Sequence, residues 1–436
     1  MAIAGPTYDG AAWVNGLWMV LLMAGLYGWG HCCFDARTGW WAAALSLVVP
    51  LLAQHRLDFL LDYPLTVAVV YSYWFCQAWC DRLRGYGADR PGEAWLAWGW
   101  AVAMGLSWAV VLLTRTSGLL FLAPPLLWLV GGIGWGLLRH GRRRTSWLRL
   151  LQGLTALLVT WLGIGGWFSQ NWLTIISTTL ESTQHGVTLR GDPQANTLAG
   201  WLYYPQVLPE MLSPLLVLLG LAVWSALHFN PSRPQRQNES WRWLWFLAIA
   251  IYVLGSLGAN KQPRLLMPWL LPWLVMIARG LVLVPGSGGT ALRWGAFGAA
   301  ALLVTGHLFP VGLPTYGSTR YPDRTAPYPH NELIDAIATT DPHLRRTLGV
   351  LVNTAQLNPM NLDFAGAARN FQVYARQLGF RPDDAIPDGR SLSWYVTKTG
   401  DQGEYATIEA GQQSLRQFID TSPDLPHCPS LAPSRW

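Results

Sequence analysis

The chain has 436 residues, of which 51% are hydrophobic and only 12% are charged, and 27 of them are tryptophan. An ordinary soluble protein would carry about a quarter of its residues as charges, so this composition argues for a membrane protein. Tryptophan concentrates at membrane–water interfaces, where its ring is half in apolar surroundings and its N–H finds a partner. The net charge of +6 comes from arginine, because Lys261 and Lys398 are the only lysines. Arginine-rich cytoplasmic loops explain this balance without any nucleic-acid partner.

About ten apolar segments are long enough, or nearly long enough, to span a bilayer. The second segment is short, and we expect it to continue as helix through Gln54–Leu61. The sequence therefore predicts an all-α polytopic membrane bundle of about ten transmembrane helices. The ten segments lie near Ala12–Gly30, Trp40–Ala53, Leu65–Cys80, Trp95–Leu113, Gly118–Leu138, Leu150–Phe168, Leu208–Leu227, Trp241–Leu257, Leu265–Val284 and Trp294–Leu313.

Arginines gather in alternate loops of this predicted bundle, which makes that side cytoplasmic by the positive-inside rule. The opposite side then receives residues 54–64, 114–117 and 169–207, the loop with Lys261 and Arg264, and both termini. An outside N-terminus is unexpected, because Met1–Gly10 has neither a signal peptide nor a basic start. The arginines that set the cytoplasmic side are Arg82, Arg84, Arg90, Arg139, Arg142, Arg143, Arg144, Arg149, Arg233, Arg236, Arg242 and Arg293.

From about Tyr316 onward, charged residues, proline and asparagine become more frequent, and no apolar run is long enough to span a membrane. We expect residues 1–315 to form the membrane domain and residues 316–436 to form a small extracytoplasmic α/β domain. Asn358 followed by Pro359 predicts the start of a helix, with asparagine as its cap. The other expected elements are a helix at Asn331–Thr340, a strand at Thr347–Val352, a strand at Ser391–Thr397 and a helix at Glu404–Ile419.

Four ionisable side chains follow the second apolar segment: His55, Arg56, Asp58 and Asp62. Asp58 and Asp62 are four residues apart, so a helix would place them on one side. Such a pair could position a sugar or bind a cation, whereas the alternative is a solvated loop with a local Arg56–carboxylate pair. We favour a functional role for Asp62, because an acid directly before a new span is costly there without one.

Three cations lie in short loops between apolar segments on the same predicted side. Arg115 has no other charge close to it in sequence, so it needs an acidic partner or a phosphate. Lys261 and Arg264 together match the charge of a phosphodiester or pyrophosphate, since Arg grips two oxygens and Lys supplies a point charge. The alternatives are that Arg115 pairs with Asp62 or Asp58, and that the other two are interfacial anchors.

Residues 169–207 form the longest predicted outer loop. Within it, Trp172, Ile175, Ile176 and Leu180 fall on one face at helical spacing, which predicts an interfacial amphipathic helix over Asn171–Ser182. Two interpretations stay open for a loop of this length, a lid or acceptor site and a cover for the bundle. The polar and aromatic residues that follow in the loop are His185, Arg190, Asp192, Tyr203 and Tyr204.

No nucleotide-binding loop, serine-hydrolase motif or zinc pattern is present among the 436 residues. The five cysteines are Cys32, Cys33, Cys76, Cys80 and Cys428. Cys76 and Cys80 share a helix face inside an apolar run, which favours packing over metal binding. The sequence therefore predicts no metal site.

The order of these motifs resembles the GT-C membrane glycosyltransferases, which include protein O-mannosyltransferases and lipid A aminoarabinose transferases. Pro50, Arg56 and the Asp62–Leu65 stretch are similar to that family's proline, arginine, then aspartate before a span. The Leu113–Leu120 turn resembles a turn with lysine at the position of Arg115. Lys261–Pro268 is similar to the lysine-x-x-arginine-tyrosine-leucine-x-proline signature, with Leu265 in place of tyrosine.

Farther along, Asn361 and the Arg376–Gly379 stretch resemble the outer domain of some bacterial members. One departure is that the family begins with a first span and an outer loop whose acidic motif supplies the expected base. This chain has no such part, and Asp9 is the only acid at the corresponding place. We therefore expect the chain to lack the first span and loop, which would also explain an outside N-terminus.

The resemblance implies a glycosyltransferase that moves a sugar from a polyprenyl-phosphate donor to a lipid, glycan or protein acceptor at the outer face of the inner cell membrane. It assigns Lys261, Arg264 and Arg115 to the lipid phosphate, and Asp62 with Asp58 to catalytic support. His55, Arg56, Tyr203 and Tyr204 would position the substrates. Some members use a divalent metal, but no cofactor is demanded here. The alternative is a non-catalytic lipid-binding or transporter-like membrane protein.

Overall fold

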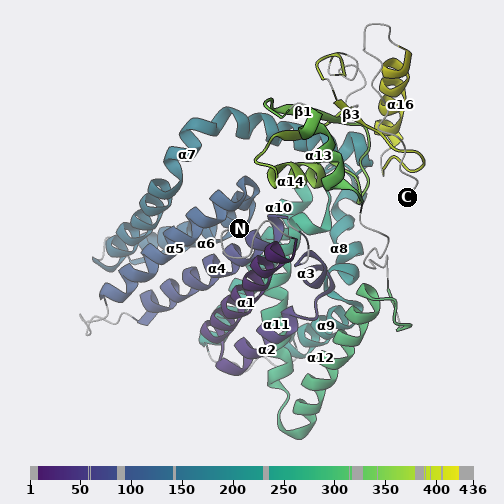
Figure 1. The fold of residues 1–436 in the computed structure, drawn as a ribbon. Helices are drawn as coiled ribbons and strands as arrows, with labels where there is room; N and C mark the ends of the chain where they lie inside the picture. Colours follow the sequence, from purple (N-terminus) through teal and green to yellow (C-terminus); the bar gives the residue numbers. More distant parts are fainter. Residues whose placement is uncertain are drawn as a thin grey trace. The chain divides into compact units, whose positions relative to one another are not determined.

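A computed structural model describes residues 8–56, 58, 60–85, 94–140, 144–228, 235–313, 315–316, 328–340, 342–378, 387, 389–392, 394–403 and 406–421. The chain divides into two compact units, Met1–Pro322 and Asp323–Trp436. The first is a polytopic α-helical membrane bundle and the second is a small α/β domain (Figure 1). The predicted fold class is confirmed.

Helices cover most of each of the ten predicted apolar segments. Six helices of the described part are long and apolar enough to cross a membrane, and a bent helix pair makes up to seven. The expected number of about ten spans is therefore not confirmed. In order, the elements are α1 (Tyr8–Cys33), α2 (Ala36–Ser46), α3 (Pro50–His55), α4 (Asp62–Gly85), α5 (Ala94–Thr114), η2 (Thr116–Gly118), α6 (Leu119–His140), α7 (Arg144–Arg190), α8 (Leu198–Leu212), α9 (Pro214–His228), α10 (Gln235–Leu257), η3 (Pro263–Trp269), α11 (Leu270–Leu283) and α12 (Gly286–Leu308).

Two predicted spans are each broken into two helices. The second segment forms α2 and, after a break, α3. Helix α3 begins at Pro50, because proline has no N–H to continue the previous helix. The seventh breaks at Ser213, whose φ of 90° is left-handed, so α8 and α9 meet at 109°. The expected continuation of helix through Gln54–Leu61 is also wrong, since α3 ends at His55.

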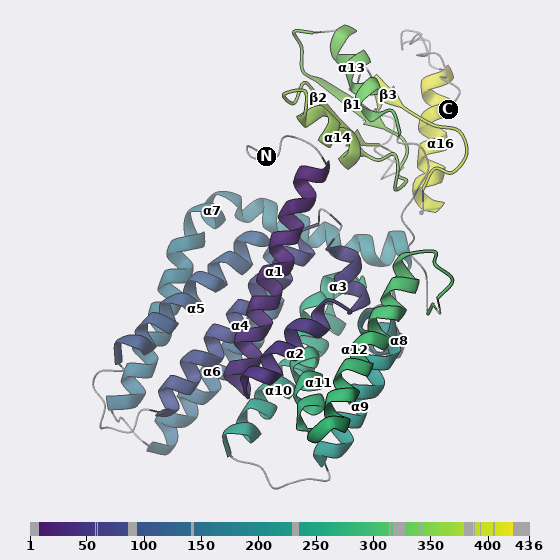
Figure 2. The same ribbon diagram turned by 60° about the horizontal axis from the view of Figure 1, so that its bottom comes forward.

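The prediction that residues 169–207 form a long outer loop is wrong, because α7 continues as one helix of 47 residues to Arg190. Only residues 191–197 connect it to α8. Figures 1 and 2 show that α7 curves along its length. The predicted helix over this stretch is confirmed. Of the four apolar side chains expected on one face, Trp172, Ile176 and Leu180 are exposed and Ile175 is half-buried. The position of this part of α7 in a membrane interface stays a prediction.

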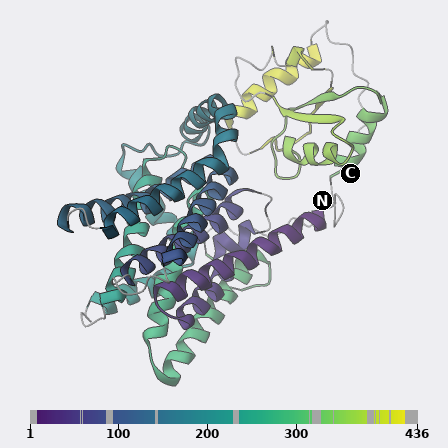
Figure 3. The same cartoon turned by 90° about the vertical axis from the view of Figure 1, so that its left-hand side faces the viewer.

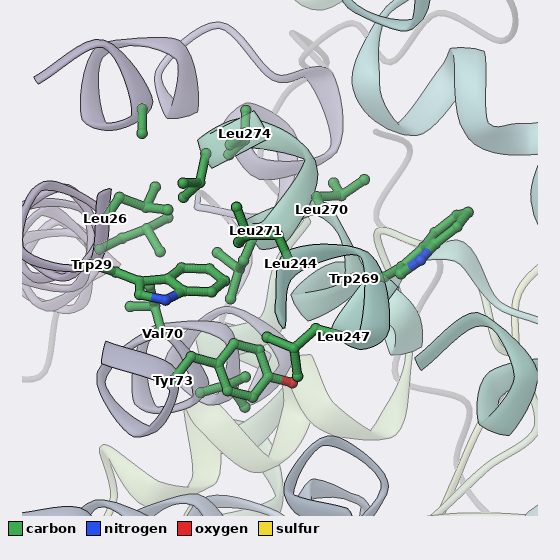
Figure 4. Packing of buried hydrophobic residues seen from close by; sticks show 14 of the residues in the cluster. Leu26, Trp29, Val70, Tyr73, Leu244, Leu247, Trp269, Leu270, Leu271 and Leu274 are labelled. Atoms are coloured by element: carbon green, nitrogen blue, oxygen red, sulfur yellow. The ribbon is translucent and has the colours of Figure 1, made fainter. Parts of the chain in front are cut away.

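The core of the bundle lies where α1, α4, α10 and α11 meet. Figure 4 shows Trp29 of α1 beside Tyr73 of α4, with ring centroids 5.4 Å apart. The Tyr73 hydroxyl is buried and donates to the carbonyl of Phe121 in α6 at 3.0 Å. Trp79 likewise donates from its indole nitrogen to Gln152 of α7 at 3.0 Å. These bonds satisfy polar groups that have no water available to them.

An ion pair joins helices far apart in sequence away from the predicted outer loops. Arg279 of α11 donates to the Asp35 carboxylate at 2.5 Å, and its guanidinium lies 5.1 Å from the centre of the Phe34 ring. Asp35 also caps α2 by accepting from the Thr38 N–H at 2.8 Å. Burial raises the pKa of Asp35, but the Thr38 hydrogen bonds and the Arg279 charge outweigh it and hold the pKa below 3.8. The ion pair with Asp35 therefore explains how the charged side chain of Arg279 is accommodated within the apolar helix α11.

The second unit is built on a three-stranded parallel sheet in the order β2-β1-β3. Helices α13 and α14 cover one face and α16 covers the other (Figure 3). Asn358 caps α14 by accepting from the Asn361 N–H at 3.0 Å, so this predicted helix start is confirmed. Strand β2 was not predicted. The elements are α13 (His330–Thr340), β1 (Arg346–Val350), α14 (Pro359–Ala367), β2 (Val373–Gln377), β3 (Trp394–Val396) and α16 (Ala406–Thr421).

Helices α5 and α7 approach closely at Gly105. A Cβ atom there would lie 2.4 Å from the carbonyl oxygen of Ala156. The Thr160 hydroxyl of α7 donates back to the Gly105 carbonyl at 3.0 Å. Small residues that let two backbones meet are a usual means of packing helices in membranes, and this contact ties α7 to the bundle.

We expect Gly105→Ala to destabilise the protein by about 1–3 kcal/mol, because the new methyl group forces α5 and α7 apart. Gly99→Ala in the same helix is the matched control, because a Cβ there has nothing within 4 Å. It should be neutral or slightly stabilising. Thermal unfolding of both variants in detergent checks this, and equal melting temperatures would show that the close contact does not form.

Candidate functional site

The sequence-predicted site residues lie on elements that pack together. The 3₁₀ helix η3, which follows Lys261, packs against α3, α4 and α8. Helix α3 ends at His55, α4 begins at Asp62, and η2 packs against α5 and α6 directly after Arg115. We call the set of chain segments 54–62, 115–118, 191–197 and 258–264 the loop end of the bundle.

Asp62 and Arg115 form an ion pair at the loop end. Arg115 donates from Nη1 to Asp62 Oδ1, and the Asp62 side chain is 5% exposed while that of Arg115 is 33% exposed. Asp62 is the first residue of α4, where the N–H groups of the first helical turn stabilise a negative charge. The geometry thus supports the interpretation that Arg115 pairs with Asp62. The proposed role of Arg115 in binding phosphate stays a prediction.

His55 and Asp58 form a second pair, with 2.6 Å between His55 Nδ1 and Asp58 Oδ2. His55 is buried at the end of α3, and the Asp58 side chain is 37% exposed. Asp58 lies before α4 and Asp62 opens it, so the expectation that one helix carries both carboxylates is wrong. The reason is local: Pro64 in the first turn of α4 disfavours helix before it.

Arg56 does not form the local carboxylate pair that was weighed for it. It donates instead to the sulfur of Met19 in α1 at 3.6 Å. The side chain of Asn15, also in α1, donates to the Asp58 carbonyl at 3.3 Å. Helix α1 therefore holds the 54–62 segment from one side, a contact that no sequence motif indicated.

Lys261 is fully buried, which a loop position between two spans did not predict. Its Nζ donates to the carbonyl of Ser256 and lies 5.7 Å from the centre of the Tyr204 ring. Its backbone N–H donates to the Asp192 carboxylate at 3.0 Å. Burial lowers the pKa of Lys261 below 10.5, and the nearby negative charge of Asp192 opposes that shift. Lys261 is therefore a buried charge and not an interfacial anchor.

Arg264 is half-buried at the start of η3. Its Nε donates to the Gln262 side chain at 2.5 Å, which fixes the plane of the guanidinium. The two terminal nitrogens have no hydrogen-bond partner within the described part of the chain. A guanidinium with a fixed plane and two free N–H₂ groups is well suited to bind phosphate oxygens.

Tyr203 and Tyr204 lie on α8 and not in a loop, with their ring centroids 5.2 Å apart. Tyr204 is buried between Lys261 and Trp269. It therefore supports Lys261, whereas Tyr203 is half-buried. The side chains of His185 and Arg190 lie outside the described residues.

Asp192 and Ser256 are the residues whose part in the site was missed. Asp192 was noted only as a loop acid, and Ser256 was not noted at all. Asp192 is 69 positions from Lys261 and Ser256 is five, and the contacts of both depend on how the chain folds back. The only sequence signal for either was an acid in a connection next to an apolar segment. Among the described residues, no group of three histidine, cysteine or acidic side chains is placed to hold a metal ion.

No protein-family model and no curated protein sequence matches the chain. Solved structures are similar to it. ArnT from Cupriavidus metallidurans bound to undecaprenyl phosphate has 18% identity and a TM-score of 0.44, over 68% of this chain and 50% of ArnT. ArnT in the apo state has 15% identity and a TM-score of 0.49, over 85% of this chain and 71% of ArnT.

The archaeal oligosaccharyltransferase AglB from Archaeoglobus fulgidus, in complex with an inhibitory peptide and a dolichol-phosphate, has 11% identity and a TM-score of 0.49. That match covers 85% of this chain and 53% of AglB. The chain spans half the length of the ligand-bound ArnT chain. With TM-scores this low, the matches carry no argument about activity.

We expect Asp62→Ala and Arg115→Ala each to lower stability, because each leaves a partly buried charge without its partner. The double variant should lose less than the sum of the two single losses, with a coupling of about 1–2 kcal/mol. Thermal unfolding of the four proteins in detergent measures the cycle. Strictly additive losses would mean that the two side chains do not interact.

Proposed function

We propose that the chain is a glycosyltransferase that takes a sugar from a polyprenyl-phosphate donor and passes it to an acceptor hydroxyl at the loop end. The observation that carries the proposal is Arg264, whose guanidinium is fixed through Nε and open at its two terminal nitrogens. A half-buried, membrane-level cation with unused donors calls for an anion. A lipid phosphate is the anion that reaches this depth.

Lys261, three residues before Arg264, adds positive charge to the proposed site. Its Nζ is buried, so it acts on the phosphate through its field and not by direct contact. Charge interactions are stronger where water is excluded. The buried ammonium therefore stabilises the negative charge that grows on the phosphate as the bond to the sugar breaks. Arg115, which is one-third exposed beside Asp62, would help as a third cation.

The proposed reaction is a direct displacement at the anomeric carbon of the sugar. The acceptor oxygen forms the new bond, the lipid phosphate leaves with the electron pair of the old bond, and a carboxylate takes the acceptor proton. Of the two acids in the 54–62 segment, Asp58 is the more exposed and Asp62 is committed to Arg115, while Asp192 binds the backbone of Lys261. We assign Asp58 to proton transfer, and Asp62 to holding the cations in place.

His55 orients Asp58 through the 2.6 Å contact, and we assign Arg56 and Tyr203 to positioning the acceptor. The enzyme would lie in the inner cell membrane with its second unit on the outer side. The ArnT and AglB structures contain undecaprenyl phosphate and dolichol phosphate, which belong to the ligand class proposed here. The sugar and the acceptor, which would be a lipid, a glycan or a protein, stay open.

We expect Arg264→Ala and Lys261→Ala each to lower sugar transfer by about 10²–10³-fold, the loss typical of removing one group that stabilises transition-state charge. Transfer of radiolabelled sugar from a polyprenyl-phosphate donor, measured in membranes, is the readout. Membrane insertion should be unchanged in both variants.

The matched control is Arg293→Ala. Arg293 lies in α12 and donates to carbonyls of its own neighbourhood, Leu281 at 3.0 Å and Val284 at 3.2 Å. Its loss should leave transfer near the wild-type rate. Wild-type transfer by the Arg264 and Lys261 variants would end the assignment, and uptake into vesicles without transfer would favour a transporter.

We also expect an alkaline limb in the pH profile of transfer. Lys261 acts only when charged, and burial sets its pKa below 10.5, so activity should fall as pH rises through that lowered value. Lys261→Arg keeps its charge at all these pH values. That variant should shift the limb to higher pH even if its rate is reduced. An unchanged limb would show that another group titrates.

A further inference from the structure

The second unit contains a hollow that the proposed transfer does not use. It has a volume of about 280 Å³, close to the lower end of the range of about 300–1,000 Å³ for ligand pockets. Most of the side chains around it are polar, and none is aromatic. Its lining is Leu351, Thr397, Thr399, Gly400, Gln402, Glu409, Gln412, Gln413 and Arg416.

The hollow lies at the carboxyl ends of the parallel strands. Leu351 directly follows β1, and Thr397 directly follows β3. Ligands of α/β proteins bind outside the carboxyl ends of parallel strands, where the chain leaves the sheet and the next elements surround an open space. The position is therefore one at which a site is expected on general grounds.

Helix α16 contributes four of the residues that line the hollow. Its Leu415 packs against Leu351 and Leu378, which fixes the rotation of the helix. Its residues at positions 409, 412, 413 and 416 then line the hollow, at the i, i+3, i+4, i+7 spacing of one helix face. From the sequence alone, such a stripe is no more than the solvated face of an amphipathic helix.

Gln412 distinguishes a site from a solvated face. Its side chain is only 3% exposed, and neither Nε2 nor Oε1 has a hydrogen-bond partner in the described structure. Buried amide groups are almost always paired. An amide needs an acceptor for its N–H₂ and a donor for its oxygen. Neighbouring hydroxyl groups on one molecule supply both.

The other lining groups define the charge and polarity of the ligand. Glu409 and Arg416 carry opposite charges, so the lining as a whole is neutral and does not select an anion. Thr397 and Thr399 contribute hydroxyl groups. Gln402 donates from Nε2 to the carbonyls of Lys398 at 2.8 Å and Gly400 at 2.9 Å. Its side-chain oxygen remains as a hydrogen-bond acceptor.

We propose that this hollow binds a single unit of a neutral saccharide, with Gln412 bonded to two of its hydroxyl groups. The proposal stands apart from the proposed transferase activity, because every residue in it belongs to the second unit. It adds a carbohydrate-binding site to this domain whether or not the loop end performs transfer.

Saturation-transfer NMR on the full-length protein tests the proposal, with D-glucose, D-mannose and N-acetylglucosamine as probes at millimolar concentration. The detergent must have no sugar headgroup, so lauryldimethylamine oxide is used. At least one sugar should bind to the wild-type protein, and inorganic phosphate should not displace it. Gln412→Leu, which keeps the size of the side chain, should weaken binding by about ten-fold or more, as expected for loss of a hydrogen bond.

Gln417→Leu is the matched control, because Gln417 is an exposed residue of the same helix outside the hollow. It should bind the sugar as the wild type does. Gln412→Leu should melt no lower than the wild type, since it removes an unpaired buried amide. Wild-type protein that binds none of the three sugars, equal binding by Gln412→Leu, or displacement by phosphate would each overturn the proposal.

Discussion

A buried ammonium group needs oxygen atoms around it, and the loop end is organised by that need. Lys261 has no exposed surface, and its ammonium donates to the Ser256 carbonyl at the end of α10. The Asp192 carboxylate before α8 accepts from the backbone N–H of Lys261. These contacts bring together segments that are distant in sequence. Isolated burial of a charge is strongly unfavourable, so the surrounding packing of η3 on α3, α4 and α8 must form for the lysine to be tolerated.

The two cations of this loop, Lys261 and Arg264, differ in what their donor groups contact. Arg264 keeps its terminal nitrogens available and is held by Gln262 alone. Lys261 is committed to backbone oxygen and contributes only its charge. The Asp62–Arg115 and His55–Asp58 pairs are divided in the same way, because in each pair one side chain is almost fully buried and the other is partly exposed. Partly exposed groups can meet a substrate, and their buried partners orient them.

Local signals in the sequence predicted most of the fold and much less of the site. Apolar length predicted the helices, and Asn358 with Pro359 predicted the start of α14, because both depend on neighbouring residues. Strand β2 was not predicted because Val373–Gln377 is only five residues long and has no regular alternation of apolar and polar residues, and only its pairing with β1 makes it a strand. The burial of Lys261 and the Asp62–Arg115 pair depend on contacts 69 and 53 positions apart. A motif can suggest such contacts but cannot fix which partner is chosen.

Helix α7 has a consequence for where chemistry can happen. Its second half exposes Trp172, Ile176 and Leu180 along one stripe, and a stripe of that kind settles at a defined level between the lipid tails and the headgroups. Asp192 comes two residues after the helix ends and binds the backbone of Lys261. The position of α7 in the membrane is therefore linked to the position of Lys261 through residues 191 and 192. In the proposed transferase, lipid packing on α7 would set the depth of Lys261 in the membrane, and a thicker or thinner bilayer would change that depth.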